Sequence, residues 1–548
     1  MSREASIRPQ QIQDDLLWVA TLTVPTFSQS IAFQHKTQTM GVVAGDPIFI
    51  DQHRAPTAAQ SSKAVFDVLA NQQITQLTHT RGMFCAMAWN APERCLTLAT
   101  DKLANRCLYF KDNGKKLVFS TSLRLLRVLS DDAEKVDEQG LAEQLFFGQP
   151  MADRTLFDGI KVLGPGQALM LQAGQPPQIF TYSDYTTVPR VKLSMAEAAA
   201  QLHDRFSDAV RRRMPNSEQE AFLSGGMDSR AVVAELVDQG HTVRTFCAAY
   251  PDSIDDLVSA DVAKAFGAAH TIWHRSPADR ILVALDPFAI YARENFPTLD
   301  GRSTARTVWS GDGGSVTLGH VYMSARSVEL AGHTPTMAGM FALFPNLRAR
   351  PTRQIGSRKI QQLAELAAAG AMNELARCGG ADPDRRLFHF YMRNDQARHL
   401  YHHFESIDLS QIELLTPFFD ADFVDLVAAL PTDYFLGHKL YNQWITGFKC
   451  NAGCIYWQPY RGHLPGPHPN PYQAGDQWDN SWYTGAAISR AYTKLAGQLC
   501  GRRDGLVQPY LKRGILRACQ LLSRFGISKY NYEIAYARNM LHQLGNPA

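Results

Sequence analysis

Apolar residues follow two different patterns along this chain, and the pattern changes near residue 190. Before that point, short runs rich in β-branched and aromatic residues are separated by turn residues at hairpin distances, as in residues 16–24, 83–89, 95–100 and 107–110. Such runs predict a sheet-rich domain with a few helices. After that point, helical stretches alternate with apolar runs. We therefore expect two domains, at residues 1–190 and 191–548.

The helices and strands that this pattern predicts have clear boundaries. One helix is expected at residues 138–147 and a longer one at 194–214, where Ser194 is the N-cap and Glu197 completes a capping box. The elements expected next are strands at 221–223, 242–249 and 270–273, and a helix at 255–266 that Gly267 ends. Alternation of strand and helix is typical of a parallel sheet covered on both faces. The fold class predicted for the second domain is therefore α/β.

A glycine-rich loop connects the first strand of this second domain to the next helix. Gly225 and Gly226 allow the backbone to approach a bound group closely, and the helix that follows directs its N-terminal amides at the loop. Ser224 and Ser229 add hydroxyl donors, and Asp228 could hold a magnesium ion against phosphates. In a parallel sheet this loop lies beyond the carboxyl end of a strand, where ligands bind. The loop predicts an anion site with a metal, although a turn that binds nothing would look similar.

Composition narrows the class of protein further. Lys+Arg number 55 and Asp+Glu 52, a net charge of +3 that gives no indication of a nucleic-acid partner. The nine cysteines include no C-x-x-C pair, as expected of a reduced, cytoplasmic protein. Charged residues precede the first apolar run and no 18-residue apolar stretch occurs, so we expect neither a signal peptide nor a membrane span.

Three motifs of the second domain occur in a fixed order: residues 224–229, residues 310–315 and the Pro-Phe-Phe-Asp segment at 417–420. Together they resemble the motifs of the asparagine synthetase family. The resemblance implies an ATP-pyrophosphatase domain of the adenine nucleotide α-hydrolase type with helical additions. Such enzymes split ATP between the α and β phosphates and form an acyl-adenylate that an amine attacks.

The resemblance also implies which residues bind ATP and Mg²⁺. The nucleotide-binding residues would be Leu223, Ser224, Gly225, Gly226, Asp228, Ser229, Phe246, Ser310, Gly311, Asp312 and Gly313. Asp228 and Asp312 would hold the magnesium ion. Ser315 stands where the second motif normally has an aspartate that helps bind the metal.

Segments of the first domain, at residues 81–89, 101–110 and 159–166, resemble those of the family's glutaminase domain. This implies an Ntn-type αββα sandwich. The family's nucleophile is a cysteine at position 2, where this chain has Ser2, and the first cysteine is Cys85, within an apolar strand. We therefore expect a glutaminase-like scaffold without glutaminase activity, so that ammonia is not the amine used.

A catalytic cation is expected late in the chain, because amide-forming members of the family place a lysine there. Residues 455–467 contain no lysine. Lys449 and Arg461 are the candidate catalytic residues, since a cation stabilises the negative charge that develops during amine attack. Each could instead be an ordinary surface cation.

The W-x-x-Y-x-G-H-x-P-x-P pattern at residues 457–467 resembles the macrolactam synthetases that close lasso peptides. Those enzymes adenylate an Asp or Glu side chain of a ribosomal peptide, which the peptide's own N-terminal amine attacks. The implied partners are a peptide or small-molecule carboxylate substrate, a precursor peptide and a leader protease. The alternatives are an asparagine synthetase that uses ammonia and a non-catalytic binding protein. The aromatic residues nearby would suit either a peptide groove or a core: Tyr456, Trp457, Tyr460, Trp478, Trp482 and Tyr483.

Overall fold

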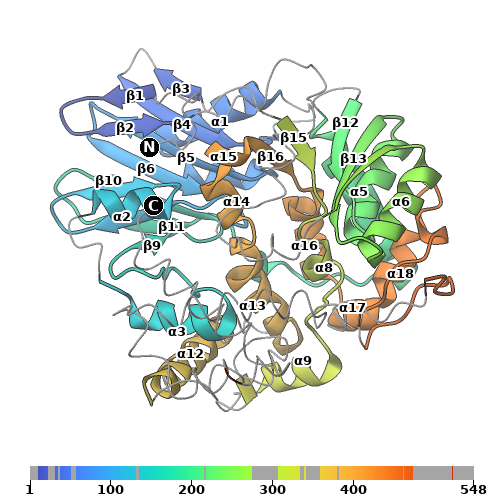
Figure 1. Ribbon diagram of the computed structural model, residues 1–548. Coiled ribbons are helices and arrows are strands. Elements are labelled where there is room, and N and C mark those ends of the chain that lie inside the picture. The colour runs from blue at the N-terminus through green and yellow to red at the C-terminus, as the bar shows by residue number, and fades with distance from the viewer. Residues whose placement is uncertain are drawn as a thin grey trace.

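The structure is a computed structural model that describes most of the chain, and the statements below concern the part it describes. These residues are 10–22, 31–34, 38–50, 57–130, 135–214, 218–274, 306–333, 339–340, 343, 358–378, 382–460, 462–472 and 521. Figure 1 shows the antiparallel sheets of the first half in blue and the parallel sheet of the second half mainly in green. Helices from both halves lie between and below the two sheet regions (Figure 1).

The first domain contains an antiparallel sheet with the strand order β11-β10-β6-β5-β4-β3. These strands are β3 (Ile31–Gln34), β4 (Thr39–Gly45), β5 (Phe84–Asn90), β6 (Cys95–Thr100), β10 (Gln167–Gln172) and β11 (Gln178–Thr181). A second sheet has the order β8-β7-β9, with β7 (Tyr109–Asp112), β8 (Leu117–Ser120) and β9 (Lys161–Val162). A separate hairpin pairs β1 (Gln10–Gln13) with β2 (Trp18–Thr21).

The alternation of side chains along β5 explains how these sheets are stacked. Phe84 and Ala86 belong to the core under helix α1 (Ala58–Ala70). Cys85 and Met87 point the other way, into a core shared with Phe110 of the second sheet. Successive side chains of a strand point to opposite faces, so a fully apolar strand requires cover on both. Helix α2 (Leu123–Leu129) packs on β7 and β8, which completes the expected αββα order.

The second domain is built on a parallel sheet with the order β14-β13-β12-β15-β16. Its strands are β12 (Glu218–Phe222), β13 (Thr242–Ala249), β14 (Ala269–His274), β15 (Arg306–Trp309) and β16 (Ile412–Leu415). The chain starts at β12, moves outward to β14, and then continues on the other side with β15. The boundary between β12 and β15 is therefore the topological switch point, where ligands of such sheets bind.

The two predicted helices of this domain begin within one residue of the expected positions, although the first ends at Arg211, three residues before the predicted end at 214. Helix α4 (Met195–Arg211) has Ser194 as its N-cap, in a capping box with Glu197. Helix α6 (Ile254–Phe266) ends at Gly267, whose φ of 68° is in the left-handed region. Between them, α5 (Met227–Asp238) follows the glycine loop. The remaining described α-helices of this half are α8 (Gly314–Thr317), α9 (Ala325–Gly332), α12 (Arg358–Arg377), α13 (Arg386–Asn394), α14 (Tyr401–Glu405), α15 (Ile407–Ser410), α16 (Ala421–Ala429), α17 (Thr432–Phe435) and α18 (Lys439–Ile445).

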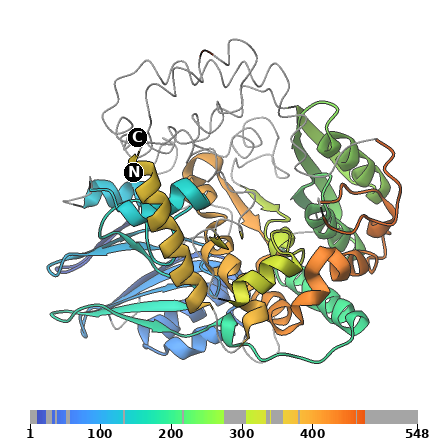
Figure 2. The ribbon, with the colours of Figure 1, turned by 90° about the horizontal axis from the view of Figure 1, so that it is seen from below.

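Helix α3 (Glu138–Phe147), at the residues predicted, joins the two domains by packing on α12. Both lie at the lower edge of Figure 1, and α12 is the long gold helix of Figure 2. The helices cross closely at Gly370, where a Cβ would lie 2.2 Å from Glu143 Oε1. The Gln139 side chain also donates to the carbonyl of Leu366 at 2.9 Å. One apolar core consequently runs through both domains.

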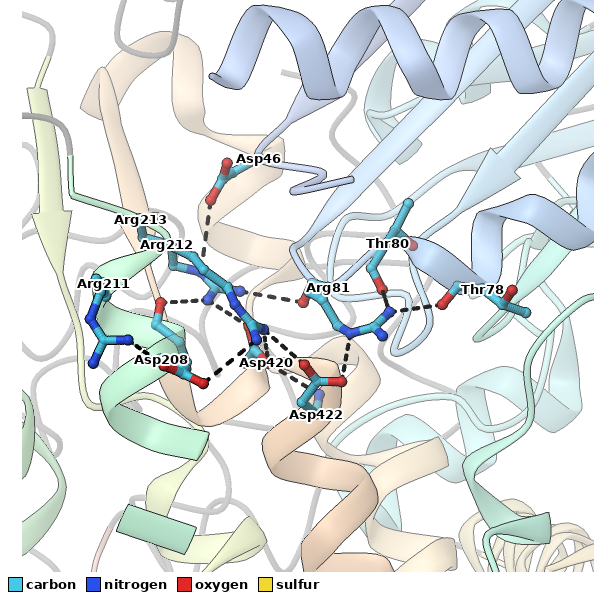
Figure 3. Close-up of polar contacts among 11 residues, drawn as sticks. Asp46, Thr78, Thr80, Arg81, Asp208, Arg211, Arg212, Arg213, Asp420 and Asp422 are labelled. Carbon is cyan, nitrogen blue, oxygen red and sulfur yellow. Dashed lines mark hydrogen bonds and ion pairs between the residues drawn. The ribbon is translucent and has the colours of Figure 1, made fainter. Parts of the chain in front are cut away.

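A group of arginines and aspartates forms a second contact between the domains (Figure 3). Arg81 of the first domain lies 2.5 Å from Asp422, and Arg212 approaches the other oxygen of the same carboxylate at 2.8 Å. Arg213 lies 2.7 Å from Asp420, whose side chain is fully buried, and also donates to the carbonyl of Arg81. Asp420 accepts from the amide of Asp422 and so caps α16, as expected from its motif. We call these five residues the interdomain cluster.

Candidate functional site

The loop between β12 and α5 is fixed by hydrogen bonds to its own serines and to α6. The backbone amide of Ser224 donates to Ser229 Oγ at 2.9 Å, and the two serine hydroxyls lie 3.0 Å apart. The amide of Gly225 donates to Asp255 Oδ1 at 3.0 Å. Gly226 is the N-cap of α5 and has no side chain with which to cap the helix. The first amides of α5 are thus directed at the loop, as an anion site requires.

The two glycine-rich runs predicted from the sequence lie against each other. They follow β12 and β15, which are adjacent strands paired at Ala221 and Trp309. A Cβ at Gly311 would lie 2.4 Å from the backbone nitrogen of Ser229, and one at Gly314 would lie 2.6 Å from Asp228 Oδ1. No larger side chain fits at either position without displacing the loop. The glycines of the second run are therefore required by its contact with the first.

Asp228 occupies the centre of this contact and is held by hydroxyl groups. Ser315 Oγ donates to one carboxylate oxygen, and the Tyr441 hydroxyl donates to the other at 2.5 Å. Burial raises the pKa of Asp228 to about 6; the two hydroxyl donors act in the opposite direction, while the nearby charge of Asp312 adds to the rise. Ser315, where the family motif has an aspartate, is here a donor to the remaining acid.

Asp312 has a different environment, because its carboxylate contacts a histidine. Its carboxylate accepts from Ser310 Oγ at 2.5 Å and lies 3.0 Å from His399 Nε2. Burial alone would raise the pKa of Asp312, but the hydrogen bond and charge of His399 hold it below its ordinary value. The bond to Asp312 in turn raises the pKa of His399, against the effect of burial. The two carboxylates predicted to hold metal are thus close together but unequal.

The donor set fits a magnesium ion shared by the two acids. The charge of Asp312 disfavours ionisation of Asp228, whose pKa it raises, and a divalent cation would remove that repulsion. Within the described ranges, no cluster of three or more His, Cys, Asp or Glu side chains could hold a metal by itself. Further ligands would have to be hydroxyl, phosphate or water oxygens, which Mg²⁺ accepts readily.

The nucleotide side of the predicted site also contains Leu223 and Phe246, on neighbouring strands. The amide of Leu223 donates to the carbonyl of Phe246 at 2.8 Å, and both side chains are buried. The structure therefore brings both residues to the carboxyl edge of the sheet beside the glycine loop. Their contact with an adenine base stays a prediction.

The structure does not bring Lys449 to the glycine loops. Its side chain is exposed, and its backbone amide donates to Asp238 at 2.6 Å, at the last residue of α5. Asp228 lies ten residues earlier on this helix, about 15 Å away at 1.5 Å per residue, which is farther than a lysine side chain extends. Arg461 lies outside the described residues.

The expected loss of glutaminase chemistry stays a prediction, because Ser2 lies outside the described residues. Cys85, the first cysteine, is buried in β5, and burial raises the pKa of its thiol to about 11. A thiol with such a pKa is not a thiolate near neutral pH. Cys85 is therefore a core residue and no substitute nucleophile.

Two tyrosines of the site were not predicted: the sequence analysis missed Tyr441 and left open whether Tyr460 belongs to a peptide groove or to the core. Tyr441 gives no signal in the sequence beyond its place in a short amphipathic helix, α18. Tyr460 belongs to the aromatic set of the W-x-x-Y pattern, and its hydroxyl lies 3.4 Å from Ser315 Oγ. Tyr456 and Trp457 of that set are buried, as core residues are, whereas Trp478, Trp482 and Tyr483 lie outside the described residues.

Fold and site together define a class: two-domain amidotransferase-like proteins, in which a glutaminase-type sandwich precedes a parallel sheet with paired glycine loops. Comparison with known proteins agrees. Residues 58–182 match the family model of a glutamine amidotransferase domain, and residues 201–441 match that of asparagine synthase. The chain belongs to the asparagine synthetase family.

Individual relatives are distant and match only in part. The chain is 27% identical over 165 residues to asparagine synthetase [glutamine-hydrolyzing] 3 of Bacillus subtilis (strain 168), which covers 30% of this chain and 26% of the relative. It is 25% identical over 190 residues to asparagine synthetase [glutamine-hydrolyzing] 1 of the same organism, covering 34% and 29%. It is 23% identical over 240 residues to amidase chry2 of Gibberella zeae, covering 40% and 33%. The matches thus span a third or less of each relative. Among the described helices, none is long and apolar enough to cross a membrane.

Proposed function

We propose that this protein is an ATP-dependent, AMP-forming amide ligase, which adenylates a carboxylate and couples it to an amine. The observation that carries the proposal is the contact of the two glycine loops at the switch point of the parallel sheet. Gly311 and Gly314 lie so close to Ser229 and Asp228 that the two loops form one continuous wall. Family membership adds that the relatives named asparagine synthetases form carbon–nitrogen bonds.

In this proposal each described residue has a definite task. The N-terminal amides of α5 bind the pyrophosphate end of ATP, because they are hydrogen-bond donors directed at the loop. The hydroxyls of Ser224 and Ser229 lie in the same loop, where Ser229 Oγ accepts from the amide of Ser224 and each hydroxyl has a proton to donate to phosphate. Asp228 and Asp312 hold Mg²⁺, which when bound would neutralise phosphate charge and stabilise the leaving pyrophosphate. Leu223 and Phe246 lie side by side next to the glycine loop, where the adenine base would bind; because both side chains are buried, their backbone is what they would present to it.

We further propose that the acid is an Asp or Glu side chain of a ribosomal peptide and that the amine is the peptide's own N-terminus. The W-x-x-Y-x-G-H-x-P-x-P pattern supports this choice, since its Tyr460 reaches the wall of the site at Ser315. The experiment is ATP–pyrophosphate exchange with synthetic linear peptides that contain one internal Asp or Glu. Exchange followed by loss of one water from the peptide mass is the expected result.

An N-acetylated copy of each peptide separates the two half-reactions. It retains the carboxylate and should support exchange, but it has no amine and should not cyclise. Free ammonium added to it would yield a side-chain amide if the enzyme uses ammonia, which would contradict the macrolactam proposal. Absence of exchange with every peptide and small carboxylate at saturating Mg²⁺ would contradict the ligase proposal itself.

A further inference from the structure

One buried arginine next to the glycine loop has no task in the function described above. Arg230 lies in the first turn of α5 and is fully buried. A cation at this end of a helix opposes the helix dipole, and burial removes the guanidinium from water. Both effects are unfavourable, so the surroundings of the guanidinium must offset them.

Backbone carbonyls of the W-x-x-Y region provide that compensation. Arg230 donates to the carbonyl of Ile455 at 2.6 Å, to that of Tyr456 at 2.8 Å and to that of Ala452 at 3.3 Å. Its guanidinium carbon lies 5.5 Å from the ring centroid of Trp457, within reach of a cation–π contact. We call residues 452–460 the strap.

The strap reaches the candidate site at its far end. The Tyr460 hydroxyl lies 3.4 Å from Ser315 Oγ, which in turn donates to Asp228. Arg230 of α5 thus contacts the first part of the strap. Tyr460, at the end of the strap, contacts Ser315 of α8. The planar guanidinium is suited to several carbonyls at fixed angles, which a lysine ammonium cannot reproduce.

We propose that Arg230 is a positioning residue, which fixes the strap and thereby the Tyr460 hydroxyl against Ser315 at the substrate side of the proposed ligase site. The proposal rests on the ligase function for its kinetic readout. It does not rest on that function for its structural readout, which is the order of the strap itself. The two can therefore fail separately.

The kinetic test is a double-mutant cycle between Arg230→Lys and Tyr460→Phe, followed by ATP–pyrophosphate exchange. Displacement of a positioned group by about 1 Å can reduce a rate by up to about 100-fold, so each single variant should lower kcat about 10- to 100-fold. If Arg230 acts through Tyr460, the double variant should be no slower than the slower single variant. Multiplying effects would contradict the proposal.

The structural test needs no activity. Hydrogen exchange of the full-length protein should show the strap amides exchanging at least about tenfold faster in Arg230→Lys than in the wild type, because their local opening becomes less costly. The matched control is Arg385→Lys, since Arg385 is another buried arginine that donates to carbonyls, those of Val188 and Ala428, remote from the strap. Unchanged strap exchange in Arg230→Lys, or equal acceleration in the control, would overturn the proposal even if the wild type proves inactive.

Discussion

The interdomain cluster and the glycine-loop site both bury aspartates, but the pKa of Asp228 in the site is shifted in the opposite direction to that of Asp422 in the cluster. In the interdomain cluster, burial acts to raise the pKa of Asp422, and the charges of Arg81 and Arg212 outweigh it and hold that pKa below its ordinary value. In the site, hydroxyls contact Asp228 and its pKa is raised to about 6. In the interdomain cluster three arginines compensate two aspartates, whereas the site retains a negative charge that a bound cation could neutralise. A buried charge left uncompensated indicates where a ligand is expected.

Breaking the interdomain cluster should have the largest effect on stability. Arg213→Met removes the nearer of the two arginines that contact the fully buried Asp420 and leaves Arg212 at 3.8 Å. It should lower the free energy of unfolding by about 3 kcal/mol, because the buried charge is then poorly compensated. Chemical denaturation measures this loss. The double variant with Asp420→Asn should recover much of this lost stability. If Arg213→Met alone lowered the free energy of unfolding by less than about 1 kcal/mol, solvent would be screening the ion pair.

Removing the charge of Asp228 should abolish catalysis without loss of stability. Asp228→Asn should lower ATP–pyrophosphate exchange by at least about 100-fold, since the proposed metal loses a ligand. Thermal unfolding at about pH 5, below the raised pKa of Asp228, should change little. Asp238→Asn at the other end of α5 is the control, because Asp238 accepts from the amides of residues 449 and 450, remote from the glycine loops. Normal exchange in Asp228→Asn would remove the metal assignment.

Restoring the family's aspartate should make stability depend on magnesium. In Ser315→Asp a second carboxylate faces Asp228, and two acids that share a site shift a pKa by about 2 units, or about 3 kcal/mol. We expect a lower melting temperature in chelator and recovery when Mg²⁺ is added. Ser315→Asn, which is neutral and similar in size, should show no such recovery.

The pH dependence of stability should reveal Asp228 without any ligand. Its folded pKa of about 6 lies above the unfolded value near 4, so between these values the folded state holds a proton that the unfolded state has lost. The free energy of unfolding should therefore fall as pH rises from about 4 to about 6, by up to about 3 kcal/mol for this group. Asp46 and Asp101, whose pKa values burial also raises to about 6, contribute in the same direction. The free energy of unfolding of wild type minus that of Asp228→Asn, measured at each pH, isolates the contribution of Asp228. A difference that does not vary with pH would contradict the raised pKa of Asp228.

The smallest effect is expected at Lys449. Its backbone lies at the far end of α5, so Lys449→Ala should change exchange less than about twofold. A large loss of kcat with unchanged stability would instead show that Lys449 takes part in the reaction.

Elements whose structure depends on neighbouring residues could be predicted from the sequence. The capping box at Ser194, the stop at Gly267 and the continuous apolar run of β13 each depend on neighbouring residues, and each was predicted correctly. The run at residues 16–24 is an exception: Asp14 accepts from the amides of Leu16 and Leu17, so these form a turn and β2 begins at Trp18. A capping side chain there outcompetes strand propensity.

Contacts between distant segments could not be predicted. Tyr441 bonds Asp228 across 213 positions of sequence, and no local pattern marks either partner for the other. Lys449 shows the converse error, because proximity in sequence to the W-x-x-Y pattern did not imply proximity to the site. The glycine runs were predictable as turns from local pattern. That they meet was implied only by the family resemblance, and the structure explains it by the pairing of β12 with β15.

The close crossing of α3 and α12 at Gly370 bears on how this protein can be dissected experimentally. A fragment that stops after β11 would leave the apolar flank of α3 in water, including Leu141, Leu145 and Phe146, which belong to the core shared by both domains. Such a fragment invites aggregation. Co-expression of the two halves as separate polypeptides, each supplying one helix of the crossing, is the more promising route to a soluble, reconstituted pair.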